Sequence, residues 1–237
     1  KESDSKITAT VYCNGAVGET EFTVSYRESS VYGSLKVVSA ANCYSVGDIV
    51  LSDGRKVSVT EVETYEIDET NRPIGVVAIA NYNGGTAKIL GLQCSDSIQW
   101  ALSGTTGYYE DFEGIKVDVT GGNWDGTSYS GYSFEGDLDG SDNWEYICSV
   151  DPSASWNAEY NYPVFNFANN YGSYAGLEGT EYESGWYVPS IAELYDVYTN
   201  KTTIKTSMNA AGLYGVESCC YWSSSQSASS YDSVYKL

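Results

Sequence analysis

The fold is decided by one stretch near the carboxyl end, Gly185-Trp186-Tyr187-Val188-Pro189-Ser190-Ile191-Ala192-Glu193-Leu194-Tyr195. Ser190 and Glu193 have the spacing of a capping box, in which each side chain binds the backbone N–H of the other residue. Apolar and aromatic side chains then recur at helical spacing on one face, at Ile191, Leu194, Tyr195 and Tyr198. The stretch predicts a capped helix that follows Pro189, and a further turn or two is expected over residues 203–211.

Two tryptophans flank this helix in the sequence. Trp186 precedes it, and Trp222 lies in the later segment Tyr221-Trp222-Ser223-Ser224-Ser225-Gln226. Large aromatic side chains dominate packing energetics, so both tryptophans are expected to hold strand, helix and carboxyl-terminal loop together. For both residues, packing in the core is favoured over contact with a ligand.

Short β-strands are predicted upstream of the helix. Leu35–Val38, Ile49–Leu51 and Lys56–Val62 fit the length and composition of strands, and Ser52-Asp53-Gly54 supplies a hairpin turn between the last two. The continuous apolar run Ile74–Ala80 is typical of a buried central strand. These segments predict a sheet in the first half of the chain.

Residues 103–140 show little periodicity and many Gly, Thr, Tyr and Asp residues, so we expect a long loop region with short embedded segments there. Two short helices should follow. One begins near Asp142, whose spacing to Glu145 fits a capping box, and the other begins at Pro163 and ends at Gly172. With the strands, these helices predict one α+β domain.

The first 34 residues are expected to form an appendage. Ile7–Tyr12 and Glu21–Tyr26 alternate apolar and polar residues around a turn-rich segment, which predicts a β-hairpin. This hairpin resembles the last two strands of a bacterial immunoglobulin-like domain, and residues 27–34 are expected to be a linker. The predicted domains are therefore 1–34, the hairpin and linker, and 35–237, the α+β domain.

The chain is strongly acidic, with 32 acidic and 12 basic residues among 237 and a net charge of −20. Such a charge repels phosphate backbones and anionic membranes, so nucleic acid is not an expected partner and direct insertion into a membrane is not expected. The sequence contains no apolar stretch of membrane-spanning length, and its first residues lack the apolar run of a signal peptide. We therefore expect a mature or trimmed product.

Histidine is absent, which excludes mechanisms that need an imidazole base and zinc sites with a histidine ligand. The six cysteines form no C-x-x-C pair, and their state stays open between disulfides and free buried thiols. The 23 tyrosines and 24 glycines, with abundant Ser, Thr and Asn, are typical of binding surfaces. Composition thus favours a binding protein over an enzyme.

Gly185–Tyr195 and Tyr221–Gln226 together resemble the W-Y-x-P-S-x-x-E-L and Y-W-S-S-S/T motifs of the Lcl C-terminal-domain family. Val46–Gly54, Ile74–Val77 and Asp139–Trp144 are also similar to segments of these bacterial surface proteins, so the resemblance covers the range 35–237. It implies a C-type-lectin-like fold, related to that of formylglycine-generating enzymes. The chain ends sooner after the Trp-Ser-Ser segment than family members do, so its closing strand is short or the sequence is truncated.

Proteins of this fold include the variable receptors of diversity-generating retroelements, whose carboxyl-terminal strands form the ligand-binding face. By this resemblance we expect the exposed ligand-binding surface between Ser223 and Tyr235, and an exposed polar loop without a ligand is the alternative. Polar side chains and tyrosine suit such a surface because they hydrogen-bond and stack. The candidate ligand-binding residues are Ser223, Ser224, Ser225, Gln226, Ser227, Ser229, Ser230, Tyr231, Asp232 and Tyr235.

Asp137, Asp139 and Asp142 are the candidate metal ligands, because carboxylate oxygens at close spacing suit Ca²⁺. Their segment is not an EF-hand loop, and capping or turn formation is the favoured role. No cofactor is expected, and calcium is the alternative. No catalytic residue is assigned, since the adjacent Cys219 and Cys220 do not match the cysteine arrangement of formylglycine-generating enzymes.

The sequence therefore predicts a non-catalytic adhesin or receptor, of the kind that a retroelement diversifies, with a protein or glycan as its ligand. A calcium-dependent carbohydrate-binding module and an enzyme of the formylglycine-generating type are the alternatives. The expected location is extracellular or on the bacterial cell surface, with a lipid anchor on a removed N-terminus as one means of attachment.

Overall fold

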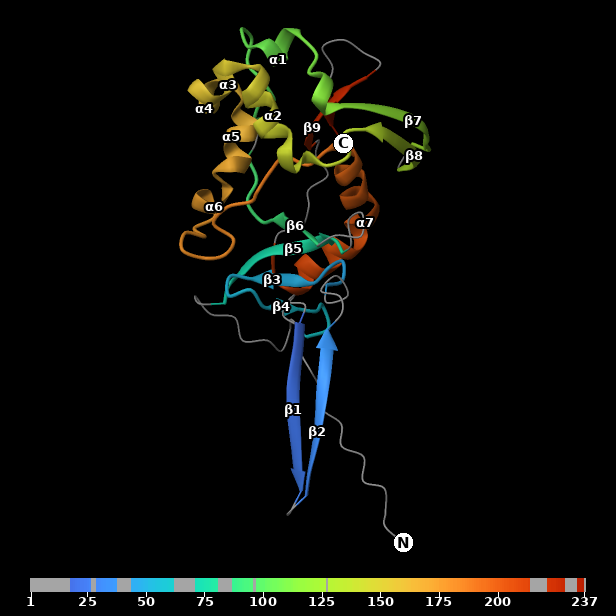
Figure 1. Cartoon of the computed structure of the whole chain (residues 1–237). Helices are drawn as coiled ribbons and strands as arrows, with labels where there is room; N and C mark the ends of the chain where they lie inside the picture. The colour runs from blue at the N-terminus through green and yellow to red at the C-terminus, as the bar shows by residue number, and fades with distance from the viewer. Residues whose placement is uncertain are drawn as a thin grey trace.

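The computed structural model describes residues 18–26, 29–37, 44–61, 71–80, 87–95, 97–126, 128–213, 221–228 and 234–236, with backbone alone for 18–37 and 234–236. This part of the chain combines helices with three β-sheets and is an α+β protein. Figure 1 shows α7 (Ile191–Ala210) running along one side of the molecule, from the sheet that contains β7 towards the sheet that contains β5, with short helices on the other side.

The first four-stranded sheet has the order β4-β3-β5-β6 and is antiparallel throughout. The apolar run predicted as a central strand forms β5, and nearly all of it is buried, because both faces of this strand are covered. The predicted turn between β3 and β4 is confirmed, but β4 is only two residues long. The strands are β3 (Ile49–Leu51), β4 (Lys56–Val57), β5 (Pro73–Ile79) and β6 (Lys88–Gly91).

The second four-stranded sheet has the order β10-β9-β7-β8, and β9 runs parallel to β7. The loop region predicted for residues 103–140 is wrong for residues 116–124 and 129–136, because β7 and β8 form a long antiparallel hairpin there. Gly121, Gly122 and Gly131 have positive φ in this hairpin and interrupt the alternation that would reveal a strand. The strands are β7 (Lys116–Trp124), β8 (Tyr129–Gly136), β9 (Trp222–Ser227) and β10 (Val234–Lys236).

Helix α7 begins with the predicted capping box. Ser190 Oγ accepts a hydrogen bond from Glu193 N at 3.2 Å, and the Glu193 carboxylate accepts one from Ser190 N at 2.9 Å. The helix is 20 residues long, so the turns expected over residues 203–211 are its continuation and not a separate element. A helix this long can contact both sheets.

Helix α7 contributes side chains to two parts of the core. Near the end of the helix, Ile204 and Met208 pack against the first sheet. Near its start, Ile191 and Leu194 pack against Val117 of the second sheet. Burying each such aliphatic side chain contributes about 1.5–3 kcal/mol, so α7 is the main connection between the two sheets.

Along the chain between β6 and α7, the residues outside the β7–β8 hairpin form a series of short helices. The helices predicted after residue 142 and at Pro163 are confirmed, but the second ends at Asn169, and Gly172 lies inside the next helix. Capping by Asp142 is wrong, since Asp139 instead accepts from Ser141 N at the start of the 3₁₀ turn Gly140–Asp142. The helices are α1 (Thr106–Tyr109), α2 (Asn143–Val150), α3 (Pro152–Trp156), α4 (Ala158–Asn161), α5 (Pro163–Asn169) and α6 (Tyr171–Tyr174).

The amino-terminal hairpin differs from the predicted one. β1 (Gly18–Tyr26) includes the strand expected at Glu21–Tyr26, but it pairs with β2 (Ser29–Val37). The linker expected over residues 27–34 is therefore wrong for residues 29–34, and the predicted domain boundary at 34/35 falls inside β2. Ile7–Tyr12 lies outside the described residues. Figure 1 shows this hairpin projecting away from the sheet that contains β3 and β4.

None of the helices in the described ranges combines the length and the hydropathy that a bilayer crossing requires.

The predicted packing role of the two tryptophans agrees with their surroundings. The indole N–H of Trp186 donates to the carbonyl of Tyr182 at 2.8 Å, and its ring lies 4.3 Å from that of Tyr171. The indole N–H of Trp222 donates to the carbonyl of Ile98 at 2.8 Å. Both rings are partly buried and tie neighbouring segments together, as expected of aromatic anchors with one polar atom.

The side chain of Asp151 links α1 to α3 and to the residue that precedes α5. Its buried carboxylate accepts from the Tyr162 hydroxyl at 2.6 Å, from Thr106 N at 2.9 Å and from Ser153 N at 2.8 Å. Burial alone raises the pKa of Asp151, but the hydrogen bonds from these three donors outweigh burial and hold the pKa below its usual value.

Replacing Asp151 by asparagine is expected to lower the free energy of unfolding strongly at pH 7 and less at pH 3. A carboxyl group whose pKa is depressed in the folded state stabilises the fold above its unfolded pKa, near 3.8. That stabilisation is lost as the pH falls through the folded-state pKa. Urea unfolding of both proteins at pH 7, 4 and 3 measures the difference, and an equal penalty at every pH would contradict this role.

Candidate functional site

The predicted ligand-binding segment begins on β9, where its side chains are buried. Ser223, Ser224 and Ser225 are 0% exposed, and Gln226 and Ser227 are 1% and 4% exposed. The prediction that Ser225 and Gln226 lie on an exposed face is therefore wrong, and Ser223–Ser227 is not an exposed polar loop. The physical reason is position, because β9 lies between β10 and β7 and also bonds to the segment before α7.

The polar side chains of β9 bind distant parts of the chain. Because these polar groups are buried, they form hydrogen bonds with protein donors and acceptors instead of with bulk water. The bonds link β9 to the start of α7, to α2 and to the segment that connects α1 with β7. They run from Ile191 N to Ser225 Oγ (3.0 Å), from Asn143 Nδ2 to Ser224 Oγ (2.8 Å), from Phe112 N to Gln226 Oε1 (2.5 Å) and from Gln226 Nε2 to the Glu110 carbonyl (3.3 Å).

The remaining candidates of this segment stay predictions. Ser229, Ser230, Tyr231 and Asp232 lie outside the described residues. Tyr235 lies on β10, of which only the backbone is described.

Among the candidate calcium ligands, Asp139 has partners within the chain. Within the described ranges, no group of three or more Cys, Asp or Glu side chains is arranged to hold a metal ion. Asp139 accepts from Ser141 N at 3.0 Å and lies 3.6 Å from the Lys88 ammonium group. Burial raises the pKa of Asp137, and the nearby charges of Asp142 and Asp139 raise it further. Calcium binding at Asp137, Asp139 and Asp142 stays a prediction.

A cluster of aromatic side chains covers the free end of the β7–β8 hairpin and the adjoining turns of α7. We call it the hairpin surface, and it consists of Trp124, Tyr129, Tyr132, Tyr195 and Tyr198. Trp124 is 52% exposed and Tyr129 is 37% exposed. Figure 1 shows the hairpin beside the first half of α7.

The rings of the hairpin surface hold each other in place. The Trp124 and Tyr129 ring centroids are 4.5 Å apart, and Tyr129 lies 5.7 Å from Tyr198. The Tyr132 and Tyr195 centroids are 5.8 Å apart. The Tyr198 hydroxyl also accepts from Tyr129 N at 2.9 Å, so the hairpin is tied to α7 by a hydrogen bond as well as by packing. Rings fixed in this way lose little entropy when a ligand binds.

Polar groups border the hairpin surface. Asp125 accepts from both the backbone N–H and the hydroxyl of Ser128, which fixes the turn between the two strands. The Lys201 ammonium group lies 3.6 Å from the centroid of the Tyr198 ring. Burial raises the pKa of Tyr198, but bonds from Lys201 and from Tyr129 N outweigh burial and lower it below its usual value.

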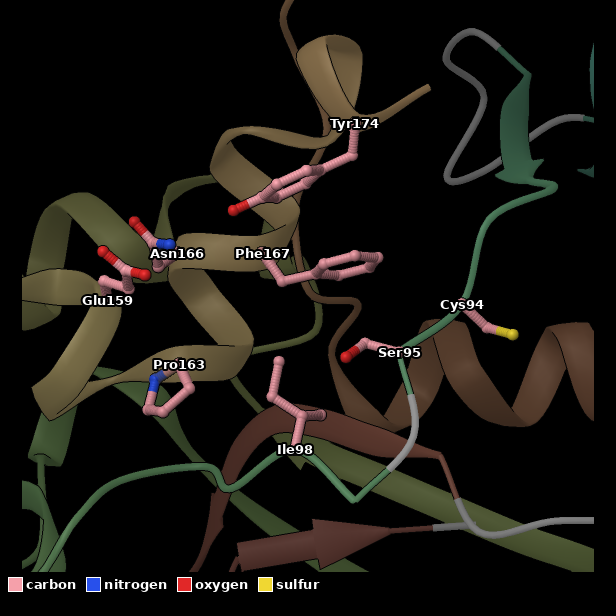
Figure 2. Close-up of a pocket in the computed structure, with 8 residues that line it drawn as sticks. All are labelled: Cys94, Ser95, Ile98, Glu159, Pro163, Asn166, Phe167 and Tyr174. Atoms are coloured by element: carbon pink, nitrogen blue, oxygen red, sulfur yellow. The ribbon is translucent and has the colours of Figure 1, made fainter. Parts of the chain in front are cut away.

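A pocket of about 350 Å³ opens between the segment 94–98 and the helices α4, α5 and α6 (Figure 2). Phe167 and Tyr174 form one wall, with ring centroids 5.4 Å apart and planes at 15°. Glu159 contributes a carboxylate at the edge, and Ile98 lies at the base of the view. The lining thus combines apolar and aromatic side chains with the polar side chains of Ser95, Glu159 and Asn166.

No sequence model of a protein family matches the chain, and no characterised protein and no solved structure matches it either. The geometry of the described residues is therefore what supports a function.

Proposed function

We propose that this chain is a non-catalytic, surface-displayed or secreted bacterial domain that binds a neutral glycan through the hairpin surface. The observation that carries the proposal is the pair of exposed rings at the hairpin tip, Trp124 and Tyr129, held 4.5 Å apart. Exposed aromatic groups that form a contiguous surface mark interaction sites, whereas isolated ones are common on any protein.

The chemistry of a sugar ring fits this surface. A pyranose has C–H groups on its faces and hydroxyl groups around its edge, so it packs on aromatic rings while its hydroxyls bond polar neighbours. The hairpin tip offers such neighbours, since Asn123 and Ser130 are exposed beside the two rings. A net charge of −20 repels anionic polysaccharides, and a neutral glycan avoids that repulsion.

The proposed fold is C-type-lectin-like, in keeping with the resemblance to the Lcl C-terminal-domain family. The two motifs that carry the resemblance are in contact, because Ser224 N donates to the Pro189 carbonyl at 2.8 Å. This contact gives a physical reason for the motifs to occur together. The hairpin surface takes the place of the carboxyl-terminal strand as the binding face, since Ser223–Ser227 of β9 are buried.

Replacing Trp124 by alanine is expected to weaken glycan binding about tenfold, because the stacking of one ring contributes about 1.5 kcal/mol. The matched control is Trp156→Ala, which removes a tryptophan that is 84% exposed on α3, away from the hairpin. A screen against neutral glycans identifies the ligand, and titration calorimetry compares the variants. Unchanged stability of Trp124→Ala in thermal unfolding shows that only the surface has changed.

Two outcomes would contradict the proposal. One is equal affinity of the Trp124→Ala variant and the wild type, and the other is a screen in which only anionic glycans or no glycan bind. Repeating the titration in EDTA distinguishes this proposal from the alternative of a calcium-dependent carbohydrate-binding module. Binding to the hairpin surface is expected to persist without calcium.

A further inference from the structure

The pocket of Figure 2 differs in chemistry from the hairpin surface. Its lining combines an apolar base, from Ile98 and Pro163, with the stacked rings of Phe167 and Tyr174. Figure 2 shows the Tyr174 hydroxyl directed towards the side of the pocket on which the Glu159 carboxylate lies. A ligand in this pocket therefore meets apolar groups below, an aromatic wall, and a negative charge at one side.

The negative charge of Glu159 has no counterion in the described part of the chain. Glu159 is exposed and makes no ion pair or hydrogen bond there. Residues 93–200 contain a single basic residue, Lys116, and its ammonium group binds Glu113 at 2.7 Å and Asp111 at 3.2 Å. Arg72, which reaches α6, donates to the carbonyl of Ala175 and does not line the pocket. None of the described residues that line the pocket is basic.

We propose that this pocket binds an alkylammonium group, a primary amine at the end of a short apolar chain. The ammonium ion pairs with Glu159 and contacts the face of the Tyr174 ring, since cations are attracted to the negative face of an aromatic ring. The methylene groups pack on Ile98 and Phe167. A volume of about 350 Å³ accommodates such a chain and is at the small end of the range for ligand sites.

The same chemistry occurs in a free amine and in a lysine side chain of a partner protein. The two sources differ because a lysine side chain is attached to a peptide backbone, which must remain outside the pocket, whereas a free amine is not. The two arms of the experiment therefore compare pentylamine with the peptide acetyl-Ala-Lys-Ala-amide. Pentan-1-ol and the matching norleucine peptide have the same apolar chain without the charge and are the respective controls.

The Ile98 methyl group reports binding directly. In protein with ¹³C-labelled isoleucine δ1 methyl groups, the Ile98 signal is assigned by its loss in Ile98→Val. We expect the amine to shift this signal saturably with a Kd of about 1 mM, because such a small ligand has few contacts. Pentan-1-ol is expected to bind at least about fivefold more weakly, since it makes neither the ion pair nor the cation–π contact.

Glu159→Gln is expected to weaken amine binding about fivefold. The matched control is Glu135→Gln, which makes the same change in net charge at an exposed position on β8 and is expected to leave the affinity unchanged. Trp124→Ala should also bind the amine normally, so this site and the glycan site can fail independently. A shift with the lysyl peptide identifies a protein partner as a source, and a shift with pentylamine alone identifies a free amine.

Three results would overturn the proposal: no shift of Ile98 with either amine up to about 50 mM, equal binding of amine and alcohol, or equal weakening by Glu159→Gln and Glu135→Gln.

Discussion

Replacing Glu193 by alanine is expected to lower the free energy of unfolding by about 4 kcal/mol, the largest effect of any substitution considered. The Glu193 carboxylate is 2% exposed and accepts from Ser190 N and Gly140 N, each at 2.9 Å. It also accepts from the Tyr187 hydroxyl at 2.7 Å and lies 3.4 Å from the Lys88 ammonium group. Alanine leaves the buried Ser190 N and Gly140 N without this acceptor, whereas Lys88 keeps its contact with Asp139.

Urea unfolding monitored by tryptophan fluorescence measures this loss. Glu193→Gln is the graded variant, because an amide oxygen keeps one acceptor while the charge is removed, and about half of the loss is expected. Glu135→Ala, on the exposed side of β8, is the control and is expected to change stability by less than about 0.5 kcal/mol. A Glu193→Ala protein within 1 kcal/mol of the wild type would show that the cap and its ion pair are dispensable.

Replacing Gln226 by leucine is expected to cost about 3 kcal/mol of stability. The Gln226 side chain accepts from Phe112 N at 2.5 Å and donates to the Glu110 carbonyl, and it is 1% exposed. Leucine has a similar size but cannot bond either group, so a buried backbone N–H loses its acceptor. The matched control is Gln99→Leu, because Gln99 is exposed and its side chain has no such bonds.

The Gln226 variant also separates two interpretations of the carboxyl-terminal segment. An expendable ligand-binding face tolerates substitution without loss of stability, whereas a buried structural strand does not. Gln226→Glu is expected to lie between the wild type and Gln226→Leu, because it keeps the acceptor for Phe112 N but buries a charge. Equal thermal stability of Gln226→Leu and Gln99→Leu would contradict the structural role of β9.

Local signals in the sequence predicted the elements that depend on neighbouring residues. The capping box of Ser190 and Glu193 needs only three residues of separation, and the helix begins where it indicates. The apolar run at β5 needs no partner to be recognised as buried. The general α+β class follows from such elements.

The burial of β9 could not be predicted in this way. A run of Ser and Gln is typical of an exposed segment, and here its polar groups are satisfied by donors that are distant in sequence. The bond from Phe112 N to Gln226 spans 114 residues, and that from Asn143 to Ser224 spans 81. Only the tertiary structure brings these donors to the strand. The polar composition of β9 therefore led to the wrong prediction that its side chains are exposed.

The hairpin surface was missed for a different reason. Its glycines, among them Gly121 and Gly122, obscured the alternation of β7. A signal was present in Tyr129-Ser130-Gly131-Tyr132-Ser133-Phe134, where aromatic residues alternate with small ones in the second half of the segment. The pocket has no such signal, because its lining comes from segments 94–98, 159–167 and 174, which only the fold brings together.

The parallel pairing of β9 with β7 has a consequence for synthesis on the ribosome. Lys116 of β7 faces Gln226 of β9, so more than a hundred further residues must be translated before this edge of β7 acquires its neighbour. During that interval the edge presents unpaired amide and carbonyl groups to other nascent chains. The first sheet, whose four strands all lie within residues 49–91, faces no such delay. We therefore expect the β4-β3-β5-β6 sheet to form first, and the pairing of β9 with β7 to be the last step of folding.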